Sequence, residues 1–192
     1  MTNKGWKKLS DELIKKNPWW EYRVKTFKMP SGQQKEYHYP KLKNGSMVVA
    51  LNDKGKVLLI RIYRPIIEEM SIAFPAGGRE QGESFLATAK RELAEETDFG
   101  ARSFEELGVF QSTPGSSTET AHVFIAYDLY TETAKKDETE DLETFWATPE
   151  EVDRMIFEGE LKDGWAICSW FFARPRILEL RASLPGAPEE SD

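Results

Sequence analysis

Residues 77–99 read GGREQGESFLATAKRELAEETDF, and this stretch organises the interpretation of the whole chain. Its second half is rich in Ala, Leu, Glu and Lys and has no Pro or Gly between Ser84 and Asp98, which predicts a helix. Ser84 is a suitable N-cap for that helix. Residues three and four apart share a helix face, so one strip gathers three carboxylates. The neighbouring face, which we expect to pack inward, carries Leu86, Ala89 and Leu93.

The three carboxylates on this strip have two interpretations. Like charges so close repel one another unless a cation neutralises them, and oxygen ligands of this kind suit Mg²⁺ or Mn²⁺ better than Zn²⁺. A solvated acidic helix face is the alternative, and the carboxylates alone do not separate the two. The preceding segment 74–78 is a predicted turn that can bring backbone carbonyls close to a metal ion, which favours the metal site.

Length and composition exclude several classes of protein. With 192 residues the chain suffices for one domain with a substantial core, and its net charge of -7 argues against general binding to nucleic acid or anionic membranes. No apolar run approaches the ~20 residues of a membrane span, and the first residues lack a signal-peptide core. Cys168 is the only cysteine, which excludes an intrachain disulfide and favours the cytoplasm. With only His38 and His122, both expected in strands, a histidine zinc site or Ser-His-Asp hydrolase is poorly supported.

The remaining chain reads as strands followed by two helices. A loop or short helix is expected over residues 1–17, and Pro149 is expected to open a helix as its first residue. A final amphipathic helix, interrupted near Pro175, is expected over residues 162–184. The predicted strands are a hairpin of 21–29 and 34–39, a second hairpin of 46–52 and 57–63, and strands at 71–74, 104–112, 121–130 and 142–146.

The spacing within the acidic helix resembles the Nudix box of the Nudix hydrolases, G-x5-E-x7-R-E-U-x-E-E, in which U is aliphatic. Seven positions match this pattern: Gly77, Glu83, Arg91, Glu92, Leu93, Glu95 and Glu96. The family pattern then continues with Gly and an apolar residue, whereas this chain has Asp98 and Phe99. Because glycine usually supplies the left-handed cap of a helix, we expect Gly100 to take over the cap.

Three features outside the box resemble the Nudix branch that acts on ADP-ribose and related nucleoside diphosphate sugars. The box follows Phe-Pro-Ala-Gly at 74–77, and TPGSSTE at 113–119 is similar to that branch's S-P-G-x-[ST]-x-E loop, although Ser116 replaces its usual bulky residue. The N-terminal hairpin and the Tyr-Arg-Pro step at 63–65 resemble the extension that these dimeric enzymes exchange between subunits. The resemblance implies an α/β fold, a Nudix-type α/β/α sandwich with a mixed sheet, plus an N-terminal β-hairpin extension.

The resemblance also implies a domain organisation and an activity. Residues 1–44 would be the extension, which dimerises and stacks on the base, 45–184 the Nudix hydrolase domain, and 185–192 a disordered tail. The implied reaction is metal-dependent hydrolysis of the diphosphate bond of nucleoside diphosphate sugars, with ADP-ribose giving AMP and ribose 5-phosphate, in a cytoplasmic homodimer. The alternatives are a GDP-mannose or nucleoside triphosphate pyrophosphatase of the same fold, or a Nudix module that binds nucleotide without cleaving it.

Roles for single residues follow from the same resemblance. The metal, Mg²⁺ with Mn²⁺ as the alternative, would be held by the carbonyl of Ala76 and the carboxylates of Glu92, Glu95 and Glu96. Arg91 would hold a box glutamate in position. The general base would be a glutamate of the charged loop before the last strand. Glu140 is favoured there and Glu138 is second, with Glu143 also available, and simple solvation is the alternative for each.

Candidate substrate contacts lie outside the box. Arg64 can bind the diphosphate through its guanidinium. The rings of Trp19, Trp20 and Tyr37 can stack on a nucleobase, and core or dimer packing is the alternative. The loop at 113–119 adds Pro114 and Glu119.

Overall fold

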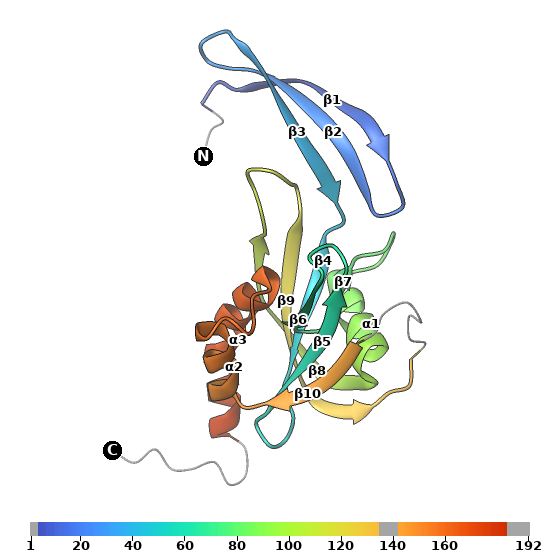
Figure 1. Ribbon diagram of the computed structural model, residues 1–192, viewed down its shortest axis with the longest axis vertical. Coiled ribbons are helices and arrows are strands. Elements are labelled where there is room, and N and C mark those ends of the chain that lie inside the picture. Colours follow the sequence, from blue (N-terminus) through green and yellow to red (C-terminus); the bar gives the residue numbers. More distant parts are fainter. Residues whose placement is uncertain (1–3, 135–141, 184–192) are drawn as a thin grey trace, which may run out of the picture. The chain divides into compact units, whose positions relative to one another are not determined.

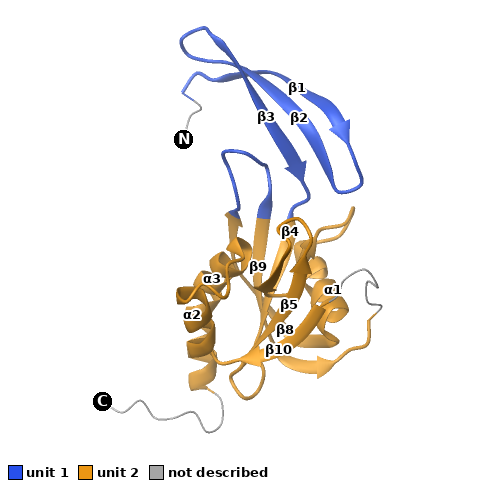
Figure 2. Ribbon diagram, in the orientation of Figure 1, with its two compact units in different colours: residues 1–44, 111–120 blue, residues 45–110, 121–192 orange. Residues whose placement is uncertain are grey.

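The computed structural model describes residues 4–134 and 142–183 (Figure 1). The chain divides into two compact units, residues 1–44 with 111–120 (unit 1) and residues 45–110 with 121–192 (unit 2), coloured separately in Figure 2. The tail at 185–192, expected to be disordered, lies outside the described residues. The functional division into an extension and a hydrolase domain stays a prediction.

Unit 1 is built on an antiparallel sheet of three strands, β1 (Lys7–Lys16), β2 (Trp20–Lys28) and β3 (Gln34–Leu42), in that order. The expected hairpin is β2–β3. The prediction of a loop or short helix before it was wrong, because β1 adds a third strand. Tertiary contacts explain this: Arg23 on β2 donates to the Asp11 carboxylate at 2.8 Å and to its carbonyl at 3.1 Å, which ties the lysine-rich segment to the hairpin.

Unit 2 holds the other sheets and all three helices of the described chain. Strand β4 runs parallel to β9 and antiparallel to β7, so the four-stranded sheet β7-β4-β9-β8 is mixed, and a second sheet has the order β10-β5-β6. None of these helices is long and apolar enough to cross a membrane. The bounds are β4 (Gly45–Ala50), β5 (Val57–Arg64), β6 (Glu69–Ala73), β7 (Ala76–Gly78), α1 (Phe85–Thr97), β8 (Phe99–Gln111), β9 (Thr120–Thr131), β10 (Leu142–Ala147), α2 (Pro149–Phe157) and α3 (Gly164–Ala182).

Two buried clusters lie on the opposite faces of β4. On one face Val48 packs with Ala89 and Leu93 of α1. On the other face the core includes Val152 of α2 and Trp170 of α3. Helix α1 and the α2–α3 pair therefore cover different faces, as Figure 1 shows, and the predicted α/β sandwich with a mixed sheet is confirmed.

Strands β4 and β5 do not form the second hairpin that the sequence predicted. One isolated bridge joins Leu51 to Val57, after which β4 pairs with β7 and β9 while β5 pairs with β6 and β10. Both strands are apolar and largely buried, so each takes partners on both of its edges. The turn is held by Asn52, whose side chain accepts hydrogen bonds from the backbone N–H groups of Lys54 and Lys56 at 3.0 and 2.9 Å.

The helices correct two further expectations. Leu86 of α1 is 39% exposed, so of the three predicted inward residues only Ala89 and Leu93 are buried. Helix α3 continues through Pro175 without interruption. Buried Ala173 and Ile177 pack on either side of the proline, and this packing holds the helix together despite the missing N–H.

Helix α1 is capped at both ends, and its C-cap is not the expected glycine. The Ser84 hydroxyl accepts a hydrogen bond from the Ala87 N–H, as predicted for an N-cap. At the other end Asp98 itself is left-handed, with φ 59°, and its N–H donates to the Ala94 carbonyl at 3.0 Å. Asp is one of the residues that tolerate this conformation, so the cap is complete before β8 begins at Phe99, and Gly100 lies within that strand.

We expect Asp98→Gly to be more stable than Asp98→Ala by about 1 kcal/mol in urea unfolding, because glycine alone avoids the steric cost of left-handed backbone. Both variants lose the same carboxylate, so the difference between them isolates the backbone. The same pair at exposed Lys90, inside α1, should show the opposite order by about 1 kcal/mol. Equal stability of the two Asp98 variants would contradict the left-handed cap.

Candidate active site

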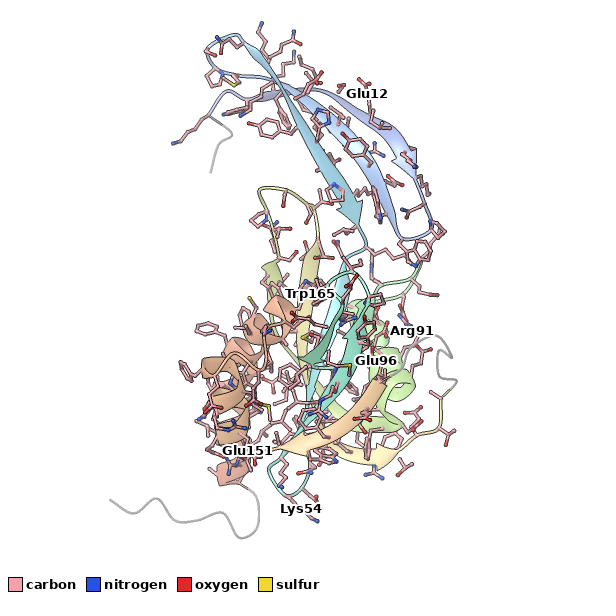
Figure 3. The ribbon with its side chains drawn as sticks, in the orientation of Figure 1. Glu12, Lys54, Arg91, Glu96, Glu151 and Trp165 are labelled. Carbon is pink, nitrogen blue, oxygen red and sulfur yellow. The ribbon has the colours of Figure 1, made fainter. Side chains whose placement is uncertain are left out.

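Arg91 and Glu96 are labelled in Figure 3, and both belong to α1. The Arg91 guanidinium connects carboxylates of this acidic helix with the loop that precedes it. Its Nε donates to Glu83 Oε1 at 3.0 Å, and its Nη1 donates to Glu92 Oε1 at 2.7 Å and to Glu95 Oε2 at 3.0 Å. Its Nη2 donates to the carbonyl of Gly78 at 3.1 Å. The hydrogen bond to Glu83 is the largest cause that raises the pKa of Arg91, so its charge is secure.

Glu83 anchors this arrangement from the loop side. Its carboxylate also accepts hydrogen bonds from the Glu80 N–H at 3.0 Å and from the Thr88 hydroxyl at 2.9 Å. The hydrogen bond from Arg91 is the main reason that the pKa of Glu83 falls from 4.5 to about 2, although burial acts in the opposite direction. Glu83 therefore stays ionised and fixes Arg91 relative to the first turn of α1.

Two box glutamates turn away from solvent toward β7. Glu92 is 9% exposed, and a Cβ added to Gly77 would come within 2.0 Å of its carboxylate, so this carboxylate occupies the space that a side chain at residue 77 would need. Glu96 is 7% exposed, and its Oε2 accepts the Ala76 N–H at 3.0 Å. This burial argues against a merely solvated acidic face for both residues. Glu95, with a side chain 36% exposed, lies further out on Arg91.

The carboxylate oxygens of Glu92, Glu95 and Glu96 suit a hard divalent cation, although they do not enclose a site on all sides. In the part of the chain that the structure describes, no three His, Cys, Asp or Glu side chains are grouped as a ready metal site. One reason for the missing group is that Arg91 already binds one oxygen of Glu92 and one oxygen of Glu95. Mg²⁺ usually keeps several waters and takes one or two carboxylates together with substrate phosphates, so a closed protein cage is not required.

The structure does not bring Arg64 or Glu143, one of the general-base candidates, to this network. Arg64 ends β5, is exposed, and pairs with no carboxylate within residues 4–134 and 142–183. Glu143 lies on β10, 3.7 Å from Arg61. Glu138 and Glu140 lie outside the described residues.

The predicted aromatic and loop contacts belong to unit 1. The N–H groups of Trp19 and Trp20 both donate to the side chain of Asn17, and the two residues are 75% and 39% exposed. Tyr37 instead contacts Trp6 and Phe27 edge-on, with ring centroids 6.3 and 5.9 Å apart, which favours packing over base stacking for this ring.

The predicted substrate loop is internally bonded. Pro114 lies in the turn that the N–H groups of Ser116 and Ser117 close on the Thr113 carbonyl. The carboxylate of Glu119 accepts the Ser112 hydroxyl at 2.6 Å.

Reasoning from the sequence missed the anchoring role of Glu83. From the sequence, Glu83 is only a matched position of the box, whereas its carboxylate is the partner that fixes Arg91. The fixed spacing of eight residues between Glu83 and Arg91 in the box was the available signal. Glu83 lies in the loop just before the helix and Arg91 about two turns into it, so the loop must lie along the helix for the two side chains to meet.

Comparison with known proteins identifies the family, because the NUDIX domain model matches residues 41–165. The chain belongs to the Nudix family. It is 31% identical over 142 residues to an ADP-ribose pyrophosphatase of Bacillus subtilis strain 168, covering 73% of this chain and 77% of that protein. It is 33% identical over 103 residues to the ADP compounds hydrolase NudE of Escherichia coli strain K12, covering 54% and 55%. The predicted enzyme class, Nudix hydrolase, is confirmed.

A solved structure of the Nudix type supports the fold. The crystal structure of an ADP compounds hydrolase superposes with a TM-score of 0.79, covering 91% of this chain and 95% of its own. Its sequence is only 22% identical, so this likeness bears on the fold alone. Among sequence relatives, the methanol dehydrogenase activator of Bacillus methanolicus is 29% identical over 143 residues, covering 73% and 77%.

We expect Gly77→Ala to weaken Mn²⁺ binding by about tenfold, because the new methyl group displaces the Glu92 carboxylate from its place beside β7. Calorimetric titration of the purified protein with Mn²⁺ measures this change, and circular dichroism checks that the fold persists. Gly164→Ala is the matched control, since a Cβ there meets no atom within 4 Å. Unchanged Mn²⁺ affinity in Gly77→Ala would show that Glu92 is not a ligand.

The lowered pKa of Glu83 predicts a pH dependence of stability. The ionised carboxylate stabilises the fold fully above its ordinary pKa of 4.5, and this contribution is lost as pH falls toward about 2. Across that window the urea-unfolding free energy of Glu83→Gln should therefore fall less steeply than that of the wild type. Glu80→Gln changes an exposed side chain of the same loop and should keep the wild-type slope. Parallel profiles for the wild type and Glu83→Gln would refute the assignment.

Proposed function

We propose that this protein hydrolyses the diphosphate bond of ADP-ribose, with Mg²⁺ as the metal and Mn²⁺ as its substitute, and releases AMP and ribose 5-phosphate. The observation that carries the proposal is the Arg91 network, which holds Glu92 and Glu95 in place beside buried Glu96 in a Nudix domain. Relatives named ADP-ribose pyrophosphatase, in Bacillus subtilis and Mycobacterium tuberculosis, and ADP-sugar pyrophosphatase, in Mus musculus, support this substrate class.

In the proposed reaction, water attacks one phosphorus atom and the P–O–P bridge breaks, so each product carries one phosphate. A bound divalent cation supplies neutralisation of the diphosphate and a lowered pKa for its bound water. The carboxylates of Glu92, Glu95 and Glu96 and the carbonyl of Ala76 would hold that cation. Arg91 keeps two of these carboxylates from rotating away, because one nitrogen donates to both.

The diphosphate needs a cationic contact from the protein, and Arg64 is the candidate. Its exposed guanidinium has no carboxylate partner in the described chain, so it can take phosphate oxygens without first breaking an ion pair. Arg61 on the same strand is less suitable, since its Nη1 lies 3.7 Å from Glu143.

For the general base we propose Glu140, with Glu138 as the second candidate, on the grounds of the family resemblance. Substituting each glutamate by Gln and recording kcat against pH tests the assignment, because loss of the base removes the acidic limb of the profile. Glu143→Gln serves as the comparison on β10.

Unit 1 is proposed to form the contacts of a cytoplasmic homodimer and to provide the base-stacking rings Trp19 and Trp20. Its sheet is small and leaves apolar side chains on β1 in solvent, which favours a protein partner. Exposure is 44% for Leu9, 51% for Leu13 and 54% for Ile14. Sedimentation of the full chain tests the oligomeric state.

We expect Glu96→Gln to fold like the wild type and to lose more than 90% of the hydrolytic rate, because the amide binds a divalent cation poorly. A tenfold loss corresponds to about 1.4 kcal/mol of barrier, so a variant that keeps more activity than this would contradict a ligand role. Glu179→Gln, on the surface of α3 beside Arg176, is the control and should retain wild-type activity.

A substrate panel with Mg²⁺ and product masses tests the proposed function. ADP-ribose is expected to be cleaved faster than the other substrates, and its products should be AMP and ribose 5-phosphate. Faster cleavage of GDP-mannose, or faster pyrophosphate release from nucleoside triphosphates, would assign a different Nudix activity. Binding of ADP-ribose without cleavage in Mg²⁺ and in Mn²⁺ would indicate a nucleotide-binding module.

A further inference from the structure

One transverse row of the four-stranded sheet lies beneath α1. Ser46 of β4 pairs with Gly77 of β7 on one side and with His122 of β9 on the other. Paired residues of neighbouring strands point to the same face, and here that face is the one that α1 covers. Buried Ser46 donates its hydroxyl to the carbonyl of Phe85 at 2.8 Å, and the Glu92 carboxylate fills the space beside Gly77.

His122 contacts the start of α1 through a ring stack. Its imidazole lies on the Phe85 ring with centroids 3.5 Å apart and planes at 13°. The Arg79 guanidinium lies 4.7 Å from the same Phe85 ring, and because His122 covers one face, Arg79 must cover the other. Arg79 also donates to the carbonyl of Glu83 at 3.3 Å, so the stack reaches the loop that carries the Arg91 anchor.

The imidazole of His122 is itself fixed from the next strand. Its Nδ1 lies 2.6 Å from Oε1 of Glu106 on β8. A carboxylate only accepts hydrogen bonds, so Nδ1 donates, which fixes the tautomer and the plane of the ring. The side chain of His122 is 18% exposed, so most of its surface is committed to these contacts.

We propose that His122, oriented by Glu106, is a positioning residue for the metal-binding face of α1. Phe85 is the first residue of that helix, and Glu92 follows two turns later on the same side. The helix is rigid over that length, so the ring that fixes Phe85 also fixes how Glu92 meets β7. Little displacement is tolerated there, because the Glu92 carboxylate already occupies the space of the missing Gly77 side chain.

The inference rests on the proposed metal site but not on the identity of the substrate. The ring stack and the hydrogen bond to Glu106 also predict different effects for different substitutions. His122→Ala removes both contacts. His122→Phe keeps the stack and loses the hydrogen bond, so it should restore much of the function. Glu106→Ala changes a half-exposed side chain, and it leaves the His122 ring stacked on Phe85 without the hydrogen bond that orients it.

The test combines Mn²⁺ calorimetry on the substrate-free protein with steady-state kinetics. Loss of a partner that orients a metal ligand costs on the order of tenfold or more, so His122→Ala should bind Mn²⁺ about tenfold more weakly and lose about tenfold in kcat. KM for ADP-ribose should change little, because the substrate contacts stay in place. His122→Phe and Glu106→Ala should lie between His122→Ala and the wild type in both measurements.

Phe99→Leu is the matched control for lost packing. Phe99 packs edge-on against Trp146 just beyond the other end of α1, with ring centroids 5.6 Å apart. It should lower thermal stability without weakening Mn²⁺ binding. Equal losses of Mn²⁺ affinity in Phe99→Leu and His122→Ala would overturn the inference, since both would then reflect general loosening of α1.

Three further outcomes test this inference separately from the proposed function. Wild-type Mn²⁺ affinity and kcat in His122→Ala would overturn the inference and leave the proposed function standing. If His122→Ala does not fold, wild-type Mn²⁺ affinity in Glu106→Ala overturns it instead. A wild-type protein that binds Mn²⁺ but does not cleave ADP-ribose would refute the proposed substrate, and weaker Mn²⁺ binding by the variants would still support the positioning role.

Discussion

The structure of the site depends on one positively charged side chain, that of Arg91, which lies among carboxylates. Arg91 binds Glu83, Glu92 and Glu95 at once, and without it three negative charges would repel one another along one side of α1 and the loop before it. The same guanidinium also binds the carbonyl of Gly78, so it joins the loop to the helix. The protein thereby keeps several anionic groups close together in a stable fold, which is the condition that the proposed divalent-cation site requires.

The sheet supplies the second constraint, which is a close approach of helix and strand. At Gly77 the backbone of β7 leaves space that the Glu92 carboxylate fills, and at Gly45 an added Cβ would come within 2.3 Å of the carbonyl of Gly77. The backbones of β4 and β7 are thus closer at Gly45 than a side chain there would allow, and the Glu92 carboxylate occupies the space beside Gly77. This geometry explains why a glycine-rich turn and an acidic helix occur together in the sequence.

The sequence was most informative where local chemistry decides the structure. The N-cap at Ser84 and the N1 proline at 149 depend on neighbouring residues alone, and both were predicted correctly. Strand β1 was missed because its lysines carry no clear alternation, and it forms through contacts with Arg23 on the next strand. The β4–β5 hairpin failed for a related reason: two apolar strands can pair with each other or with other partners, and the choice is made by the rest of the fold.

For the site, fixed spacing predicted which residues gather, while long-range pairing decided how they are held. The box named Glu92 and Glu96, but their burial depends on β7, whose Gly77 pairs with Ser46 of the earlier strand β4. No local pattern indicated that His122 would lie against Phe85, because strand order in the sheet brings them together.

Unit 1 is assembled from two separate lengths of chain, 1–44 and 111–120, and a hydrogen bond from the Thr120 N–H to the Asn44 side chain, 3.1 Å long, joins them. Deleting the first length would therefore not excise a module cleanly. The remaining segment, residues 111–120, would lose the rest of unit 1, and this segment carries Pro114 and Glu119. An activity lost on truncation of the amino-terminal sheet could therefore come from the missing sheet or from damage to the loop between β8 and β9.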